Sequence, residues 1–358
     1  MSWSCGIVGL PNAGKSTLFK AITAVDVGID SYPFTTVDPN VAVVPLEDHR
    51  LEALAALCSS KRVTPPAIRI VDVAGLVKGA SRGEGLGNRF LGELRNVDLL
   101  VHVVAGFESF GDARDDPASN AAVVNLELTL ADLETVARRK EKIGQQLKSG
   151  APGAASELIF LDRLEGHLLR GLPARRMALD STEEAFLEQL FLLTSKEMLY
   201  IFNGPEKGGP ISPPSGLAGL ARDEGCPLIS LCARLEAEIG ELPSEEKELF
   251  FKEFGLKESK VQVLLQECRS LLALIAFYTV KGEEARGWLL PRSSTALEAA
   301  FKVHTDMGRG FINAGVIPWD CLIEAGDLAA ARERGAVRTE GRDYLIADGD
   351  VLYFRFRT

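Results

Sequence analysis

The 358-residue sequence contains only four histidines and six cysteines, and no two cysteines form a C-x-x-C pair. Structural zinc sites combine cysteine and histidine ligands at short, regular spacings, so the sequence does not indicate a zinc-binding fold. Scattered cysteines also differ from the dense pattern of a disulfide-rich secreted domain. We therefore expect reduced thiols and a cytoplasmic protein.

The sequence also lacks long apolar segments, repeats and low-complexity tracts. No run approaches the roughly 18 apolar residues of a membrane-spanning helix, and we expect no membrane association. Residues 1–4 lead directly into an apolar run, without the basic and hydrophobic regions of a secretory signal. These absences favour a soluble protein.

Basic residues are fewer than acidic ones, 40 against 50, which gives a formal net charge of −10. Wrapping of duplex nucleic acid by the whole surface is disfavoured, because phosphates require a cationic field. Residues 138–176 are a local exception, with nine basic and four acidic side chains. This segment is either a solvated helix surface or an arm that binds RNA.

The 46% of hydrophobic residues can form a substantial core, and at about 150 residues per domain the length favours two or three domains. Apolar runs alternate with helix-like stretches, which predicts an α/β fold whose mainly parallel sheet has helices on both faces. The predicted strands are residues 5–10, 41–46, 67–73, 98–105, 198–203 and 227–232.

Nearly a hundred residues separate the fourth and fifth of these strands, far more than one crossover helix needs. Leucines at helical spacing predict two helices around the breaker at 149–153, with Leu126, Leu130 and Leu133 before it and Leu158, Leu161, Leu164 and Leu168 after it. After residue 276, short strand-like runs and turns predict a β-rich α+β module. We therefore expect an α/β domain at 1–120 and 195–275, a helical insert at 121–194, and a C-terminal domain at 276–358.

Residues 9–16 read GLPNAGKS and match the pattern G-x-x-x-x-G-K-[ST] between a predicted strand and a predicted helix. The glycines let backbone N–H groups surround phosphates, and the helix adds the positive end of its dipole. We expect Lys15 to hold the β- and γ-phosphates and the Ser16 hydroxyl to ligate Mg²⁺. The pattern predicts a nucleoside triphosphate site.

Asp72 and Gly75 form a D-x-x-G pattern directly after an apolar strand. We expect the Asp72 carboxylate near Mg²⁺ and the Gly75 N–H at the γ-phosphate, so that both act in hydrolysis together with Lys15. Residues 32–36, YPFTT, suit a switch loop, in which we choose Thr36 over Thr35 as a Mg²⁺ ligand.

Base recognition is expected from residues 203–206, NGPE, which follow a later strand. GTPases carry N-K-x-D there, and its aspartate accepts two hydrogen bonds from guanine. The lysine is absent here, and Glu206 is one methylene longer and follows Pro205. We therefore expect weakened guanine selectivity. Residues 230–233, SLCA, occupy the place of the last base-contacting loop.

Together with YPFTTVDPN, DVAGLVKGASRGEGLGN, VHTDMGRGFINAGVI and EGRDYLIADGDVLYFRFRT, these motifs resemble the YchF/Obg-like ATPase family over nearly the whole chain. The resemblance implies a P-loop G domain of the OBG type, a helical coiled-coil-like insert and a C-terminal β-grasp-like TGS domain. It also implies a preference for ATP over GTP and a ribosome or ribosomal RNA as partner. We expect a monomer.

The resemblance also implies the functional residues. The phosphate-binding set is Asn12, Ala13, Gly14, Lys15, Ser16 and Thr17. Ser16 and Thr36 are implied at Mg²⁺, and Asn203, Gly204 and Glu206 at the base, with the backbone of Gly204 against adenine.

Leu76 follows Gly75 where a Ras-like enzyme has the glutamine that orients the attacking water, so we expect slow turnover. Asn12 matches an asparagine that ligates K⁺ in related GTPases, which makes K⁺ a second hypothetical ion. His102 is either a core histidine with satisfied hydrogen bonds, which we favour, or a residue that positions water.

Three functions fit these observations. The first is a slow ATPase that acts as a molecular switch. The second is an Obg-class GTPase with relaxed base specificity. The third is an RNA- or ribosome-binding module in which nucleotide is structural.

Overall fold

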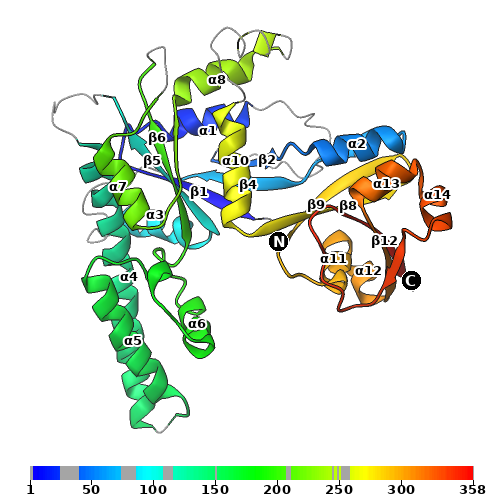
Figure 1. The fold of residues 1–358 in the computed structure, drawn as a ribbon. Helices are drawn as coiled ribbons and strands as arrows, with labels where there is room; N and C mark the ends of the chain where they lie inside the picture. The colour runs from blue at the N-terminus through cyan, green and yellow to red at the C-terminus, as the bar shows by residue number, and fades with distance from the viewer. Residues whose placement is uncertain are drawn as a thin grey trace.

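The computed structural model describes residues 3–24, 40–73, 86–107, 116–149, 151–206, 211–243, 246–247, 250 and 259–357. Within these ranges the strands form two six-stranded sheets. Figure 1 shows the first sheet among its helices, a helical arm that projects from it, and a second body at the C-terminus. None of the helices in the described part of the chain is both long and apolar enough to cross a membrane.

The first sheet has the strand order β2-β4-β1-β5-β6-β7. Its strands are β1 (Ser4–Val8), β2 (Val41–Pro45), β4 (Ala67–Asp72), β5 (Leu99–Ala105), β6 (Glu197–Asn203) and β7 (Leu228–Leu231). All neighbours are parallel except the edge strand β2, which runs antiparallel to β4. The predicted α/β fold and the six predicted strands are confirmed.

Helices cover both faces of this sheet, because its inner strands carry apolar side chains on both faces. One face packs against α1 (Lys15–Thr23), α8 (Ala233–Glu241) and α10 (Lys260–Leu271), whereas α2 (His49–Leu57) packs against the C-terminal body. The other packs against α3 (Leu86–Arg95), α4 (Pro117–Lys148) and α7 (Ser215–Asp223).

Helix α4 packs on the sheet in its first half and forms the arm in its second. Ala121, Val124 and Leu128 lie in the core beside the sheet, and further along the helix Val136 and Ile143 pack against α5 (Ala154–Leu169). The short helices η3 (Ala174–Arg176) and α6 (Ser181–Glu188) return the chain to β6.

The leucine pattern matches the buried face of the arm in α5 but only partly in α4. Leu161, Leu164 and Leu168 of α5 are buried, as predicted. The prediction is wrong for Leu126 of α4, which is 56% exposed. Small and β-branched side chains line the inward face of this helix, and Leu126 lies on a different face.

Ion pairs offset much of the positive charge of residues 138–176. Four of the nine basic side chains have carboxylate partners, in the pairs Arg139–Glu157, Lys140–Asp162 and Lys140–Glu165, Arg163–Glu183, and Arg175–Glu224. The arm therefore presents less positive charge than its sequence indicates.

The C-terminal body has a β-grasp-like fold. Strands β8 (Leu274–Lys281), β9 (Glu284–Pro291), β10 (Phe311–Pro318), β11 (Arg338–Glu340) and β12 (Asp350–Phe356) join helices α11 (Ala296–Val303), α12 (Thr305–Arg309), α13 (Trp319–Ala325) and α14 (Leu328–Glu333). The order is β11-β10-β12-β8-β9-β3, in which β12 runs parallel to β8.

The sixth strand of this second sheet comes from the N-terminal part of the chain. Strand β3 (Arg62–Thr64) pairs in parallel with β9, so that Thr64 lies beside Arg286. Strand β3 was not predicted, because three residues with two polar side chains carry no strand pattern.

A network of charged and hydroxyl side chains also joins the two bodies. Arg50 of α2 binds Asp48 through two nitrogens and Asp348 of the C-terminal body through a third. The Tyr278 hydroxyl donates to Asp48 at 2.6 Å, and Arg269 donates to Asp348. Although burial opposes it, hydrogen bonding from Arg50 and Tyr278 lowers the pKa of Asp48 below its ordinary value. Breaking one member would leave a buried charge unpaired.

All six cysteines are free, as expected.

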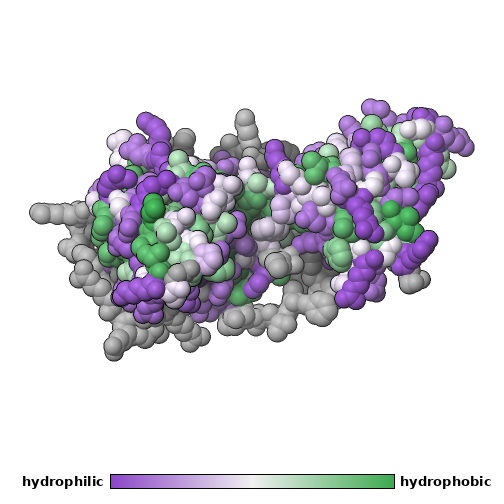
Figure 2. All heavy atoms as spheres, turned by 90° about the horizontal axis from the view of Figure 1, so that it is seen from below, coloured by the Kyte–Doolittle hydropathy of each residue, from purple (hydrophilic) through white to green (hydrophobic). Residues whose placement is uncertain are grey.

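Figure 2 shows the molecule from below, with hydrophilic residues over much of the described surface and a recess between the arm and the C-terminal body.

Candidate functional site

The P-loop connects β1 to α1 and is shaped by a left-handed backbone. Gly14 has φ 92°, and a Cβ there would stand 2.1 Å from Nδ2 of Asn203. Asn12 also has positive φ, at 62°, a conformation that asparagine tolerates better than most residues. The loop therefore depends on glycine at position 14, where another part of the chain approaches its backbone.

Lys15 is the first residue of α1, and its side chain folds back along the loop. Its Nζ donates to the carbonyl oxygen of Leu10 at 2.8 Å, and the side chain is 7% exposed. Burial lowers the pKa of Lys15, and the nearby Asp72 carboxylate partly offsets this effect. The ammonium group is thus held where a phosphate would replace the backbone oxygen as its partner.

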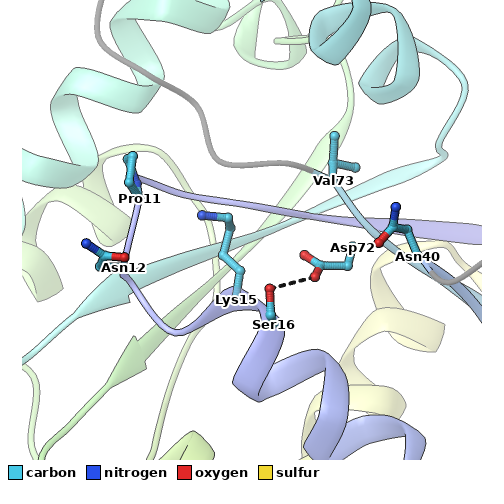
Figure 3. A pocket seen from close by; sticks show the side chains of 7 residues that line it. All are labelled: Pro11, Asn12, Lys15, Ser16, Asn40, Asp72 and Val73. Carbon is cyan, nitrogen blue, oxygen red and sulfur yellow. Dashed lines mark hydrogen bonds between the residues drawn. The ribbon is translucent and has the colours of Figure 1, made fainter. Parts of the chain in front are cut away.

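Ser16 and Asp72 meet at the floor of the same cavity. Ser16 Oγ donates to Asp72 Oδ2 at 2.8 Å, which joins the start of α1 to the end of β4. Figure 3 shows these two side chains facing each other, while Lys15 extends toward Pro11. The cavity is about 470 Å³ and is lined by Pro11, Asn12, Lys15, Ser16, Asn40, Asp72 and Val73.

The oxygen pair at Ser16 and Asp72 fits Mg²⁺. This ion prefers hard oxygen ligands, and in nucleotide sites it binds one or two protein oxygens together with phosphate oxygens and water. No cluster of three or more histidine, cysteine or acidic side chains that could hold a metal occurs in the described residues. A metal here would therefore take most of its ligands from the nucleotide and water.

Asn203, at the end of β6, connects the P-loop to the loop after β7. Its Nδ2 donates to the Ala13 carbonyl oxygen at 3.0 Å, and its Oδ1 accepts from the Ala233 N–H at 2.9 Å. The side chain is 4% exposed, so both bonds are shielded from water. Asn203 thereby fixes the phosphate loop relative to the expected base-binding loops.

Glu206 lies near the beginning of α8. Its Oε2 is 3.4 Å from Nη1 of Arg234, and both side chains are substantially exposed. Gly204 donates its N–H to the Leu231 carbonyl oxygen at 2.8 Å, which ties the NGPE segment to β7. The sequence analysis missed Arg234, although it directly follows the segment SLCA.

The structure brings most of the predicted site residues to one end of the first sheet. Asn12, Lys15, Ser16 and Asp72 line one cavity, and Ala13, Gly14 and Thr17 belong to the same loop and helix. Thr36, Gly75 and Leu76 lie outside the described residues.

Asn40 is a cavity residue that the sequence analysis missed. Its carbonyl oxygen accepts from the Asp72 N–H at 2.8 Å, next to the antiparallel pairing of β2 and β4. Its position four residues after the expected switch segment was the available signal.

His102 lies behind the P-loop rather than in the nucleotide cavity. The ring is 1% exposed, and its centroid is 5.0 Å from that of Tyr200. Burial, with the positive charges of Lys15 and Arg175, lowers the pKa of His102 to about 3. It borders a second cavity of about 60 Å³ with Leu10, Pro11, Ala13, Val103, Val104, Ala105 and Asn120. This burial agrees with the favoured interpretation of His102 as a core residue, but Nδ1 of the ring is buried without a hydrogen-bond partner among the described residues, so the expectation of a satisfied histidine is wrong.

Comparisons with known proteins cover almost the whole chain. Residues 4–143 match the family model described as 50S ribosome-binding GTPase, and residues 274–357 match YchF-GTPase_C, described as a protein of unknown function. The Ribosome-binding ATPase YchF of Bacillus subtilis is 40% identical over 366 residues, which covers 99% of this chain and 100% of the relative.

Two further relatives show the same similarity over nearly the whole chain. The Ribosome-binding ATPase YchF of Escherichia coli O157:H7 is 39% identical over 361 residues, covering 99% of each chain. The solved structure of the Schizosaccharomyces pombe YchF GTPase superposes with a TM-score of 0.88 at 27% identity, covering 99% of this chain and 98% of that one.

Proposed function

The chain belongs to the YchF family, and we propose that it is a Mg²⁺-dependent hydrolase that prefers ATP to GTP and acts as a ribosome-associated switch. The observation that carries this proposal is the cavity in which Lys15, Ser16 and Asp72 converge at the P-loop. The bacterial relatives are named ribosome-binding ATPases, which supports both the substrate and the partner.

Each of the polar residues in the cavity has a separate proposed role in hydrolysis. Lys15 would leave the Leu10 carbonyl and hold the β- and γ-phosphates as a point charge. Ser16 and Asp72 would hold Mg²⁺, directly or through water, and the ion would neutralise charge that develops on the phosphate oxygens. Thr36 and Gly75 remain the expected further contacts to the ion and the γ-phosphate.

The preference for ATP is proposed from the NGPE segment. Glu206 has an arginine beside its carboxylate, and a guanine would have to compete with Arg234 for it. Adenine requires no such carboxylate, and Gly204 remains the residue expected to lie against it through its backbone. The base site is thereby less suited to guanine than an N-K-x-D loop would be.

Calorimetric titration with ATP and GTP in Mg²⁺ buffer tests this preference. We expect tighter binding of ATP, and the double variant Pro205→Lys with Glu206→Asp is expected to shift selectivity toward GTP. A preference of at least about tenfold for GTP in the native chain, equal to 1.4 kcal/mol, would instead establish an Obg-class GTPase. The word GTPase appears in the description of the matched family model and in that of the fission-yeast relative, and it favours the Obg-class GTPase as the second candidate.

K⁺ is proposed as an accessory cation at Asn12, whose side chain borders the phosphate cavity. A cation there would add positive charge near the phosphates, as an arginine finger does. Turnover of Mg·ATP in K⁺ should exceed turnover in Na⁺ at equal ionic strength. Equal rates of turnover in the two salts would show that K⁺ takes no part in hydrolysis.

The switch hypothesis requires that ribosome binding depends on nucleotide. Co-sedimentation with ribosomes should differ between ATP and ADP for the native chain, and Lys15→Ala should abolish that difference. If Lys15→Ala binds ribosomes normally whether or not nucleotide is present, the chain is a binding module in which nucleotide is structural.

A further inference from the structure

The second cavity, which His102 borders, lies between the P-loop, strand β5 and the first turn of α4. Leu10, Pro11 and Ala13 line it from the loop, and Asn120 lines it from α4. Its volume of about 60 Å³ is several times the roughly 10–15 Å³ that one water molecule requires. The cavity therefore has room for more than one water molecule.

The cavity arises because β5 extends further than its neighbour β1. The pairing of these two strands ends at Val8 and His102, and beyond this point β5 pairs with β6 alone among the described strands. At Gly9 the chain still touches β5, because a Cβ there would stand 2.4 Å from the Val103 carbonyl oxygen. The P-loop then turns toward α1, so the edge of β5 that faces the loop has no strand beside it in the described part of the chain.

Two residues with polar side chains, His102 and Asn120, border this cavity. His102 is 1% exposed, and none of the described residues forms a hydrogen bond with Nδ1 of its ring. An apolar cavity can stay dry, whereas a buried polar atom without a protein partner is normally satisfied by an ordered water. The residues around this cavity therefore fit an internal hydration site.

The imidazole of His102 is neutral and fixed in place. Its centroid lies 5.0 Å from that of Tyr200, whose hydroxyl group accepts from Asn125 at 2.7 Å and donates to Glu224 at 3.1 Å. Burial and nearby positive charges lower the pKa of His102 to about 3. A neutral imidazole has one donor and one acceptor nitrogen, so it can bind water in either tautomer.

We propose that His102 is a positioning residue for the nucleotide site, because water that it holds in this cavity supports the P-loop from Leu10 to Ala13 in its phosphate-binding shape. The inference rests on the proposed function, since the loop must bind a nucleotide. Lys15 would leave the Leu10 carbonyl oxygen when it turns to a phosphate, and the loop then loses that contact. Water anchored to β5 preserves the shape of the loop during this change.

Nuclear magnetic resonance of the nucleotide-free native chain tests the water directly. The chain has only four histidines, so the ring signals of His102 are assigned by their loss in His102→Leu. We expect a cross-peak between the carbon-bound ring protons and a long-lived internal water. The cross-peak should persist in Tyr200→Phe, which removes a neighbouring hydroxyl group that would imitate it. The proposal is overturned if the native chain gives no cross-peak or if Tyr200→Phe abolishes it.

Calorimetric titration with Mg·ADP measures the support of the loop. His102→Leu should weaken ADP binding by about tenfold, equal to 1.4 kcal/mol. His102→Asn places an amide atom near the position of Nδ1 and should recover most of the affinity. Val101→Ala is the matched control, because Val101 is also buried on β5 but does not line the cavity, and it should bind ADP like the native chain.

Near-ultraviolet circular dichroism checks that each variant is folded. If folded His102→Leu binds ADP like the control, or if His102→Asn binds no better than His102→Leu, the imidazole only fills space in the core and the proposal is overturned. Because ADP binding requires only the P-loop, these outcomes do not depend on whether the native chain hydrolyses ATP or prefers it to GTP.

Discussion

Acid should destabilise the folded chain through His102. The imidazole is 1% exposed, and its pKa falls from an ordinary value of 6.5 to about 3 in the folded state. Between these two values the unfolded chain binds a proton that the folded chain does not, so stability falls as the pH decreases. The loss begins near pH 6.5 and is complete below pH 3.

The two pKa values set the size of the effect. The linkage relation gives a loss of about 2 kcal/mol at pH 5, about 4 kcal/mol at pH 3 and about 5 kcal/mol well below pH 3. Because the ring has almost no contact with water, solvent screening does not reduce these values. Since typical domains are stable by about 5–15 kcal/mol, this single group can control acid unfolding.

Urea unfolding of the native chain and of His102→Leu at pH 7.5, 6 and 5 measures the effect. Leucine has a similar size and does not titrate, so the variant should lose about 2 kcal/mol less between pH 7.5 and pH 5. Val101→Ala, at a buried position of the same strand, removes no titratable group and is the control that should keep the native pH dependence. If His102→Leu loses as much stability in acid as the native chain, burial of the imidazole is not the cause.

Two further substitutions test the phosphate loop and the arm. Gly14→Ala places a Cβ 2.1 Å from the Asn203 amide. Calorimetry should therefore show at least about tenfold weaker nucleotide binding. Gly144→Ala is the control: a Cβ at this position meets open space, so this variant should bind nucleotide normally. Asp132→Ala removes a buried carboxylate that accepts three hydrogen bonds, two of them from Thr194, and should cost about 3 kcal/mol in urea unfolding. A loss below 1 kcal/mol would mean that these donors find other partners.

The P-loop and the strands were predictable because their signals are local. A loop that surrounds phosphates needs glycine and lysine at fixed spacing, and Lys15, Ser16 and Asp72 therefore stand out in the sequence and line one cavity in the structure. The strands of the first sheet are short apolar runs, which burial on both faces requires.

Charge and side-chain roles were harder to predict, because they depend on partners far away in the chain. The positive charge of Arg175 is offset by Glu224, which is 49 residues distant. Asn203 is expected at the base from its motif, and only the structure shows that its side-chain hydrogen bonds also hold the P-loop and the start of α8.

The sequence by itself determined the nucleotide chemistry and the α/β class, since both follow from residue type at short spacing. Only the tertiary structure decided how the two bodies join. Strand β3 enters the C-terminal sheet, and Arg69 and Arg286, more than two hundred residues apart, come to line one pocket. Pairing between distant strands depends on the geometry of the whole fold, so no local pattern of residues predicts it.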